Sequence, residues 1–157
     1  IIATFSLLED LGLFEQFKPD VVLYDVLGDV VCGGFAAPLR AGYADEVIIV
    51  TSGEKMALYA ADNINTAVNN FADRSYARVR GIILNRRNIV DEEYKVRNFA
   101  AERNLEIIGD IPRNDDITQF EDMGKTVIEG DGSLPISKRF LRIARLLWEH
   151  EETEHEE

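Results

Sequence analysis

Short, uninterrupted runs of apolar and largely β-branched residues recur along the chain, separated by stretches long enough for helices. The runs predict buried strands at 21–26, 46–51, 81–85 and 106–109. Apolar spacing predicts a helix from Ile1 to about Phe17 and further helices at 54–72, 91–103 and 136–148. Strands that alternate with helices are joined by right-handed crossovers. We therefore expect an α/β fold with a doubly wound, mainly parallel sheet that binds ligands at the carboxyl ends of its strands.

Length and charge narrow the class of protein. A chain of 157 residues suits one domain, predicted here as 1–149, followed by an acidic tail at 150–157 that forms a frayed helix end. The net charge of −12 disfavours binding to nucleic acid or to an anionic membrane. No run approaches the ~18 apolar residues of a membrane span, and there is no signal-peptide pattern, so a cytoplasmic protein is expected. The chain opens at Ile1 inside an apolar helical pattern, which suggests a fragment.

The loop after the first predicted strand holds two acids. Asp25 ends the run and Gly28 follows it, an arrangement typical of nucleotide hydrolases that hold Mg²⁺ and sense the γ-phosphate. Asp29 could orient an attacking water. Acids at strand ends also cap helices, so the pattern alone leaves both interpretations open.

Cys32, the single cysteine, precedes two glycines. A lone cysteine is most often a small buried thiol. Alternatively, Cys32 is an iron ligand whose cluster accepts hydrogen bonds from the N–H groups of Gly33 and Gly34. Iron–sulfur clusters usually take four thiolates, so one cysteine per chain is too few even in a symmetric dimer.

Two further strand ends carry polar residues suited to a purine base. The Asn85 amide could pair with the donor and acceptor edges of adenine, although a turn-forming asparagine is the simpler reading. Pro112, Arg113 and Asn114, after the fourth predicted strand, could similarly wall a base-binding slot, with Pro112 as a flat apolar contact. The chain contains no G-x-x-x-x-G-K-[ST] phosphate loop, so it should not hold a triphosphate tightly by itself.

The string YDVLGDVVCGGFA at 24–36 closely resembles the second cysteine segment of the nitrogenase iron protein (dinitrogenase reductase) family. The iron proteins of dark protochlorophyllide reductase and of nickel-sirohydrochlorin cyclase belong to the same family. The likeness continues through shorter matches to about residue 130, including Ser52-Gly53-Glu54 and Ile111-Pro112-Arg113.

The resemblance implies an iron-protein type of P-loop NTPase fold and a homodimeric ATPase that binds MgATP. It further implies one [4Fe–4S] cluster shared between two subunits. Such a protein takes electrons from a ferredoxin or flavodoxin and delivers them at low potential to a metalloenzyme such as nitrogenase. The family's phosphate loop and first cluster cysteine would precede Ile1. The resemblance therefore implies that 1–149 are the C-terminal part of a single iron-protein-like P-loop ATPase domain, and that the fragment alone is inactive.

Carried over residue by residue, the resemblance assigns catalytic roles to Asp25 and Asp29 and a cluster ligand to Cys32. Arg40 matches a basic residue on the face that docks the partner enzyme. The remaining matches are expected cofactor-binding positions, with two beside the cluster and the others around the nucleotide: Gly33, Gly34, Asn85, Pro112, Arg113, Asn114 and Glu121.

Departures from the family pattern keep other functions open. Ala37 and Lys55 stand where methionine is usual, Ala41 where an acid is usual, Asn114 where aspartate is usual, and Thr118 where glutamine is usual. They indicate altered docking and base contacts, and they leave as an alternative an iron-protein homologue that serves a tetrapyrrole reductase. A non-redox P-loop ATPase of the partitioning or metal-insertion type and a binding module that stands alone are further alternatives.

Overall fold

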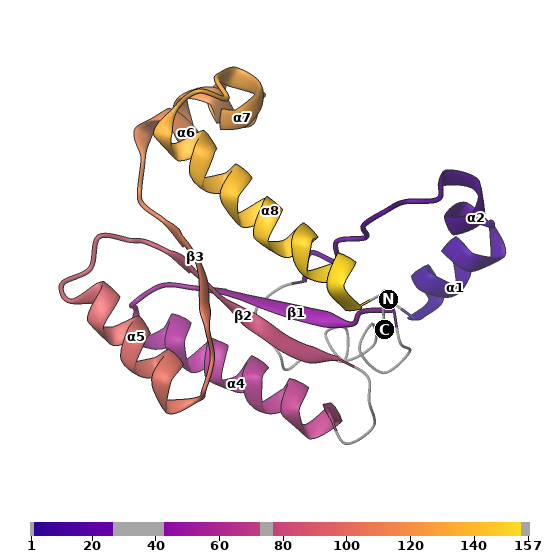
Figure 1. Cartoon of the computed structure of the whole chain (residues 1–157), viewed down its shortest axis with the longest axis horizontal. Coiled ribbons are helices and arrows are strands. Elements are labelled where there is room, and N and C mark those ends of the chain that lie inside the picture. The colour runs from indigo at the N-terminus through magenta and orange to yellow at the C-terminus, as the bar shows by residue number, and fades with distance from the viewer. Residues whose placement is uncertain (1, 27–42, 73–76, 155–157) are drawn as a thin grey trace. The chain divides into compact units, whose positions relative to one another are not determined.

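The computed structural model describes residues 2–26, 43–72 and 77–154 (Figure 1). The chain divides into two compact units, one made of Ile1–Val47 with Tyr59–Arg80 and the other of Ile48–Leu58 with Gly81–Glu157. Among the described residues, one sheet has three strands in the order β1-β2-β3: β1 (Glu46–Thr51), β2 (Arg78–Asn85) and β3 (Ile107–Ile111). These strands and the intervening helices α4 (Lys55–Ala72) and α5 (Glu92–Glu102) confirm the predicted α/β class.

Strands β2 and β3 run parallel, with Ile82 opposite Ile107 and Asn85 opposite Ile111. Positions 81 to 84 of β2 are all buried, as in a strand that is covered on both faces. The strands predicted at 46–51, 81–85 and 106–109 are thus confirmed, with shifted ends for the last two.

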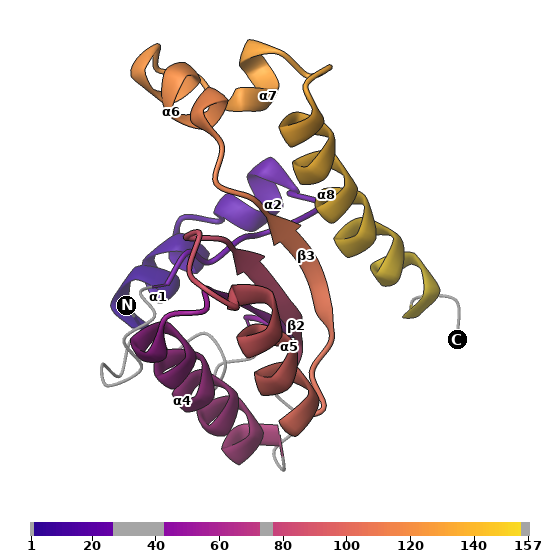
Figure 2. The same ribbon diagram turned by 90° about the vertical axis from the view of Figure 1, so that its left-hand side faces the viewer.

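Helices cover both faces of β3. A Cβ atom added at Gly109 would lie 2.7 Å from Ile143 Cδ1 of α8 (Pro135–Glu154), so Gly109 permits close packing of this helix. Successive side chains of a strand point to opposite faces, so the Asp110 side chain points away from α8. Asp110 pairs with Arg86, which also pairs with Glu93 on α5. Figure 2 shows α5 and α8 on opposite sides of this part of the sheet. Helix α5 turns Val96, Phe99 and Ala100 inward at helical spacing.

The first unit has its own small core. Val68 and Ala77 are buried there, and partly buried apolar side chains including Val26 and Val47 pack against them. The single helix predicted up to Phe17 is wrong, because the structure has α1 (Ile2–Asp10) and α2 (Leu13–Phe17). Gly12 between them has a left-handed φ of 61°. A right-handed helix ends at a residue in this conformation, which glycine adopts readily.

The strand predicted at 21–26 is also wrong. This segment forms no strand in the structure, and Val21, Val22 and Leu23 are 44%, 41% and 83% exposed. A β-branched run becomes a strand only where another strand offers unpaired N–H and C=O groups. Within the described sheet, none of the three strands pairs with this segment.

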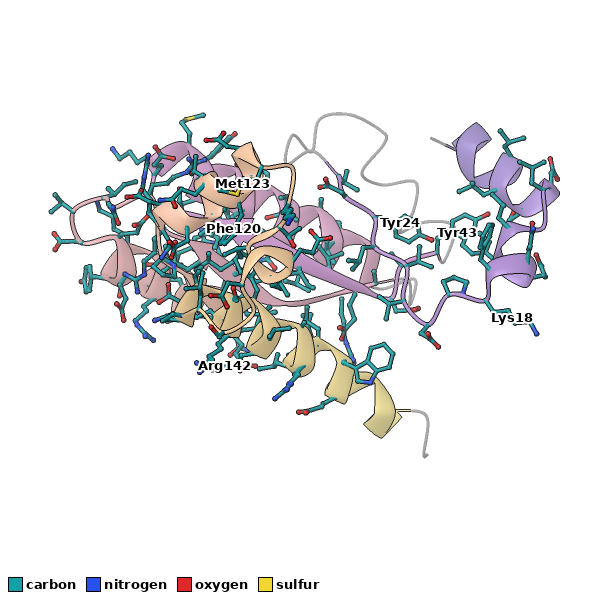
Figure 3. The ribbon with its side chains drawn as sticks, turned by 90° about the horizontal axis from the view of Figure 1, so that it is seen from above. Lys18, Tyr24, Tyr43, Phe120, Met123 and Arg142 are labelled. Carbon is teal, nitrogen blue, oxygen red and sulfur yellow. The ribbon has the colours of Figure 1, made fainter. Side chains whose placement is uncertain are left out.

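Two short helices that the sequence analysis did not predict follow β3. Helix α6 (Asp115–Asp122) carries Phe120, against which Gly130 packs at the end of α7 (Val127–Gly130). Figure 3 shows Phe120 on α6 and Met123 at the C-cap of this helix. The two helices therefore form a compact excursion between β3 and α8.

The excursion is closed where α8 begins. Thr126 and Glu129 form a reciprocal capping box on α7. Ser137 is fully buried on α8, and its single hydroxyl hydrogen is shared between the carbonyls of Val127 at 3.1 Å and Asp131 at 2.7 Å. Across the described residues, no helix is long and apolar enough to span a membrane.

Candidate functional site

The carboxyl ends of β2 and β3 bring two of the predicted loops together. Asn85, the last residue of β2, lies in register with Ile111, the last residue of β3. The Arg86 N–H then donates to the Ile111 carbonyl at 2.8 Å. This pairing sets Asn85 beside the segment that starts at Pro112. Asn85 and Arg113 are exposed and Pro112 is half-buried.

Asn114 and Glu121 belong to α6. The Asn114 side-chain oxygen accepts the N–H of Asp116 at 2.8 Å, so this asparagine is the N-cap of the helix. Glu121 is exposed on the second turn. The cap uses one of the two lone pairs of this oxygen, so the side chain retains a second acceptor site and its NH₂ donors.

Asp25 lies in the first unit, exposed and outside any strand. Val26 anchors the segment in the core around Val68, and Tyr24 on the other side of Asp25 is half-buried. Figure 3 shows Tyr24 beside Tyr43. Burial, followed by the charge of Asp45, raises the pKa of Tyr24.

Several predicted site residues lie outside the described residues, namely Asp29, Cys32, Gly33, Gly34 and Arg40. Their predicted roles stay predictions. Among residues 2–26, 43–72 and 77–154, no group of three His, Cys, Asp or Glu side chains is arranged to hold a metal ion.

Glu92 is the residue that the sequence analysis missed. It is 3% exposed at the start of α5, and its carboxylate accepts backbone N–H groups from two separate loops. From the loop after β1, Gly53 donates to Oε1 at 3.1 Å. From the turn after β2, Arg87 donates to Oε1 at 3.0 Å and to Oε2 at 3.1 Å, and Ile89 donates to Oε2 at 3.4 Å.

These donors keep the buried carboxylate charged. Burial raises the pKa of Glu92, but backbone hydrogen bonds from Arg87, Gly53, Ile89 and Asn88 outweigh it, and the net pKa is lowered. The turn that supplies most of them has left-handed residues at Asn88 (φ 59°) and Asp91 (φ 57°). Asparagine and aspartate tolerate this conformation better than other non-glycine residues.

The close approach of the two loops requires a glycine. A Cβ atom added at Gly53 would lie 2.8 Å from Glu92 Cγ and 3.0 Å from Glu92 Cα. One of these contacts is with backbone, so a side-chain rotation cannot relieve both. Gly53 therefore permits the N-terminus of α5 to pack directly against the loop after β1.

A network of charges lies behind the same turn. Arg86 binds both carboxylate oxygens of Asp110, with Nε at 2.7 Å and Nη2 at 2.6 Å, and its Nη2 also reaches Glu93 at 2.9 Å. The hydrogen bond from Arg86 lowers the pKa of Asp110, although burial opposes it. From α8, Arg139 donates to the Asp110 carbonyl at 3.0 Å. The turn after β2, β3 and α8 are thereby cross-linked.

Local sequence contained only a weak signal for Glu92. An acid in the first turn of a helix is ordinarily read as a favourable partner of the helix dipole. Its link to Gly53 spans 39 residues, and no local pattern reports it.

The sequence matches the family described as "4Fe-4S iron sulfur cluster binding proteins, NifH/frxC family" over residues 1–155. A similar protein is the nitrogenase iron protein 2 of Methanothermococcus thermolithotrophicus, with 41% identity over 97% of this chain and 52% of that protein. The nitrogenase iron protein of Methanospirillum hungatei is 51% identical over 82% of this chain and 46% of that protein. The chain thus spans about half the length of the curated relatives it matches.

Solved structures agree on the fold. The MinD cell division protein of Aquifex aeolicus superposes with a TM-score of 0.58 at 23% identity, over 76% of this chain and 49% of MinD. The MinC:MinD complex from the same organism gives a TM-score of 0.60 at 23% identity, over 75% of this chain and 47% of that one. With the match over nearly its whole length, the chain belongs to the NifH/frxC family of 4Fe–4S iron–sulfur cluster binding proteins.

Proposed function

We propose that this chain is part of an ATP-dependent electron-transfer protein that delivers low-potential electrons to a partner metalloenzyme such as nitrogenase. In this proposal, 1–149 belong to one iron-protein-like P-loop ATPase domain and 150–157 form an acidic tail. The observation that carries it is the register of β2 and β3, which brings Asn85 and the segment from Pro112 to one edge of the sheet. Parallel α/β sheets bind nucleotides at such edges.

MgATP is the proposed substrate at this edge. Asn85 supplies an amide that matches the donor and acceptor groups of adenine, and Pro112 supplies a flat apolar wall. The exposed guanidinium of Arg113 adds positive charge to the same edge. Asp25 and Asp29 are proposed to couple to Mg²⁺ and the attacking water, and Glu121 to cover the nucleotide.

The donor set for a [4Fe–4S] cluster is incomplete in this chain. Cys32 is its single cysteine, so a two-fold dimer would supply two of the usual four thiolates. We propose that the other two, and the phosphate loop, come from the remainder of a longer polypeptide. In the resulting homodimer, Gly33 and Gly34 adjoin the cluster, and Arg40 lies on the face that docks the metalloenzyme.

The test is anaerobic purification of the complete gene product, followed by iron analysis and an ATPase assay. The wild-type protein should be brown, and Cys32→Ser should lose its iron while keeping its circular dichroism spectrum. Ser6→Ala, an exposed substitution on α1, should retain iron. Wild-type iron content in Cys32→Ser would refute the ligand role. A colourless wild-type protein that hydrolyses ATP would replace the proposal with a non-redox ATPase.

The electron acceptor needs a separate measurement. A ferredoxin or flavodoxin is the proposed donor, and a cytoplasmic dimer the proposed form. Reduction of a dinitrogenase component by the complete protein would support a nitrogenase role. Reduction of a tetrapyrrole substrate with its own catalytic component would instead support the alternative that departures such as Asn114 and Thr118 favour.

A further inference from the structure

The turn after β2 is anchored at both of its ends. At the first, Arg86 N–H donates to the carbonyl of Ile111 on β3. At the other, the N–H groups of Arg87 and Ile89 converge on the Glu92 carboxylate, within 3.0 to 3.4 Å. Asn85 directly precedes this turn, so the anchors that set the path of the turn also set the position of Asn85.

Glu92 extends the anchoring to a third segment. Gly53, in the loop after β1, donates to the same carboxylate at 3.1 Å. One buried side chain therefore ties together the loops that follow two strands, and Arg86 ties the turn to the third. The Glu92 carboxylate lies at the start of α5 and contacts backbone N–H groups of the two loops.

We propose that Glu92 is a positioning residue for recognition of the nucleotide base, acting by holding the turn at 86–89 and so fixing Asn85 beside the end of β3. Glu92 does not touch the nucleotide. This inference rests on the proposed function, in which Asn85 and Arg113 lie at the base-binding edge.

Glu92→Gln is the informative substitution. Glutamine keeps the size of the side chain but turns one acceptor oxygen into an NH₂ group that faces backbone N–H donors. The donors on that side lose their partner, and the turn loosens without removal of any base-contacting group. Glu102→Gln makes the same chemical change at the far, exposed end of α5 and is the matched control.

The assay compares two probes by calorimetry on the complete gene product: MgADP, which has a base, and magnesium pyrophosphate, which does not. For Glu92→Gln, MgADP affinity should fall about ten-fold, equivalent to the loss of roughly one hydrogen bond, while pyrophosphate affinity stays within two-fold. In ATPase assays, KM should rise and kcat should hold. Glu102→Gln should match wild type for both probes.

Other outcomes would overturn the inference. Equal MgADP affinity in wild type and Glu92→Gln would show that the anchor has no role in base binding. Equal losses for both probes would show general support of the fold. If wild type binds MgADP no better than pyrophosphate, the proposed function fails first, and the inference falls with it.

A second variant covers the case in which Glu92→Gln does not fold. Glu92→Asp keeps the charge but withdraws it by about one carbon–carbon bond, roughly 1.5 Å. It should fold and show a smaller loss of MgADP affinity with unchanged pyrophosphate binding. Wild-type affinity for MgADP in Glu92→Asp would contradict the need for the full reach of the side chain.

Discussion

Replacing Gly53 with alanine should destabilise the protein by about 2 kcal/mol. The new Cβ atom would lie 2.8 Å from Glu92 Cγ, 3.0 Å from Glu92 Cα and 3.2 Å from Glu92 Cβ. Inserting a methyl group into a packed site typically costs ~1–3 kcal/mol. Glu92 cannot swing away freely, because its carboxylate is held by N–H groups of the turn after β2 as well as by Gly53. We therefore expect a cost near the middle of that range.

Thermal unfolding of the complete gene product, followed by circular dichroism, measures the effect. The relatives are about twice as long as this chain, and for a protein of that size ~2 kcal/mol corresponds to a fall in Tm of roughly 3 °C. Gly132→Ala is the matched control, because its added Cβ would meet only the Ile128 carbonyl oxygen, at an ordinary 3.7 Å. The control should change the free energy of unfolding by less than ~0.5 kcal/mol. A Gly53→Ala variant as stable as Gly132→Ala would refute the close packing of the loop after β1 against α5.

The charge network and the buried acid support two further predictions. Arg86→Met should lower the free energy of unfolding by about 1 kcal/mol, because it removes both hydrogen bonds from Arg86 to the Asp110 carboxylate. Partial exposure of this ion pair to solvent keeps the effect small. Urea unfolding measures this loss of stability. Arg97→Met, which removes a more exposed ion pair with Glu93, should cost less, and equal effects of the two substitutions would contradict this prediction. Because the pKa values of Glu92 and Asp110 are lowered in the folded state, their contribution to stability should be complete above about pH 5 and lost as the pH falls through those lowered values. Urea unfolding from pH 7 to pH 3 should show that decline, and in Glu92→Gln the decline should be shallower, so an unchanged slope in that variant would argue against the assignment.

Much of the fold follows from local sequence pattern. The runs at 46–51 and 81–85 are apolar, β-branched and bounded by polar residues, so strands could be predicted from them without knowledge of their neighbours. That the strand ends at Asn85 and Ile111 share one edge of the sheet could also be predicted, because parallel strands present their carboxyl ends at the same edge. Thr126 and Glu129 at capping-box spacing were a readable signal for α7 that the sequence analysis did not use.

The features that sequence could not supply depend on distant partners. The run at 21–26 has the composition of a strand, but pairing decides whether it becomes one. Gly12 could be accommodated in a helix at modest cost, and only the structure shows that it adopts a left-handed conformation. Glu92 was invisible as an anchor because its partner Gly53 lies 39 residues away.

The buried hydroxyl of Ser137 bears on how chains of this family can vary in length. Its bonds to the carbonyls of Val127 and Asp131 close the excursion that leaves β3 at Pro112 and returns at α8. The entropic cost of closing a loop rises only slowly with its length. Insertions or deletions within the excursion should therefore be tolerated without disturbing β3, provided that the residue at position 137 still bonds to the carbonyls at the end of the excursion.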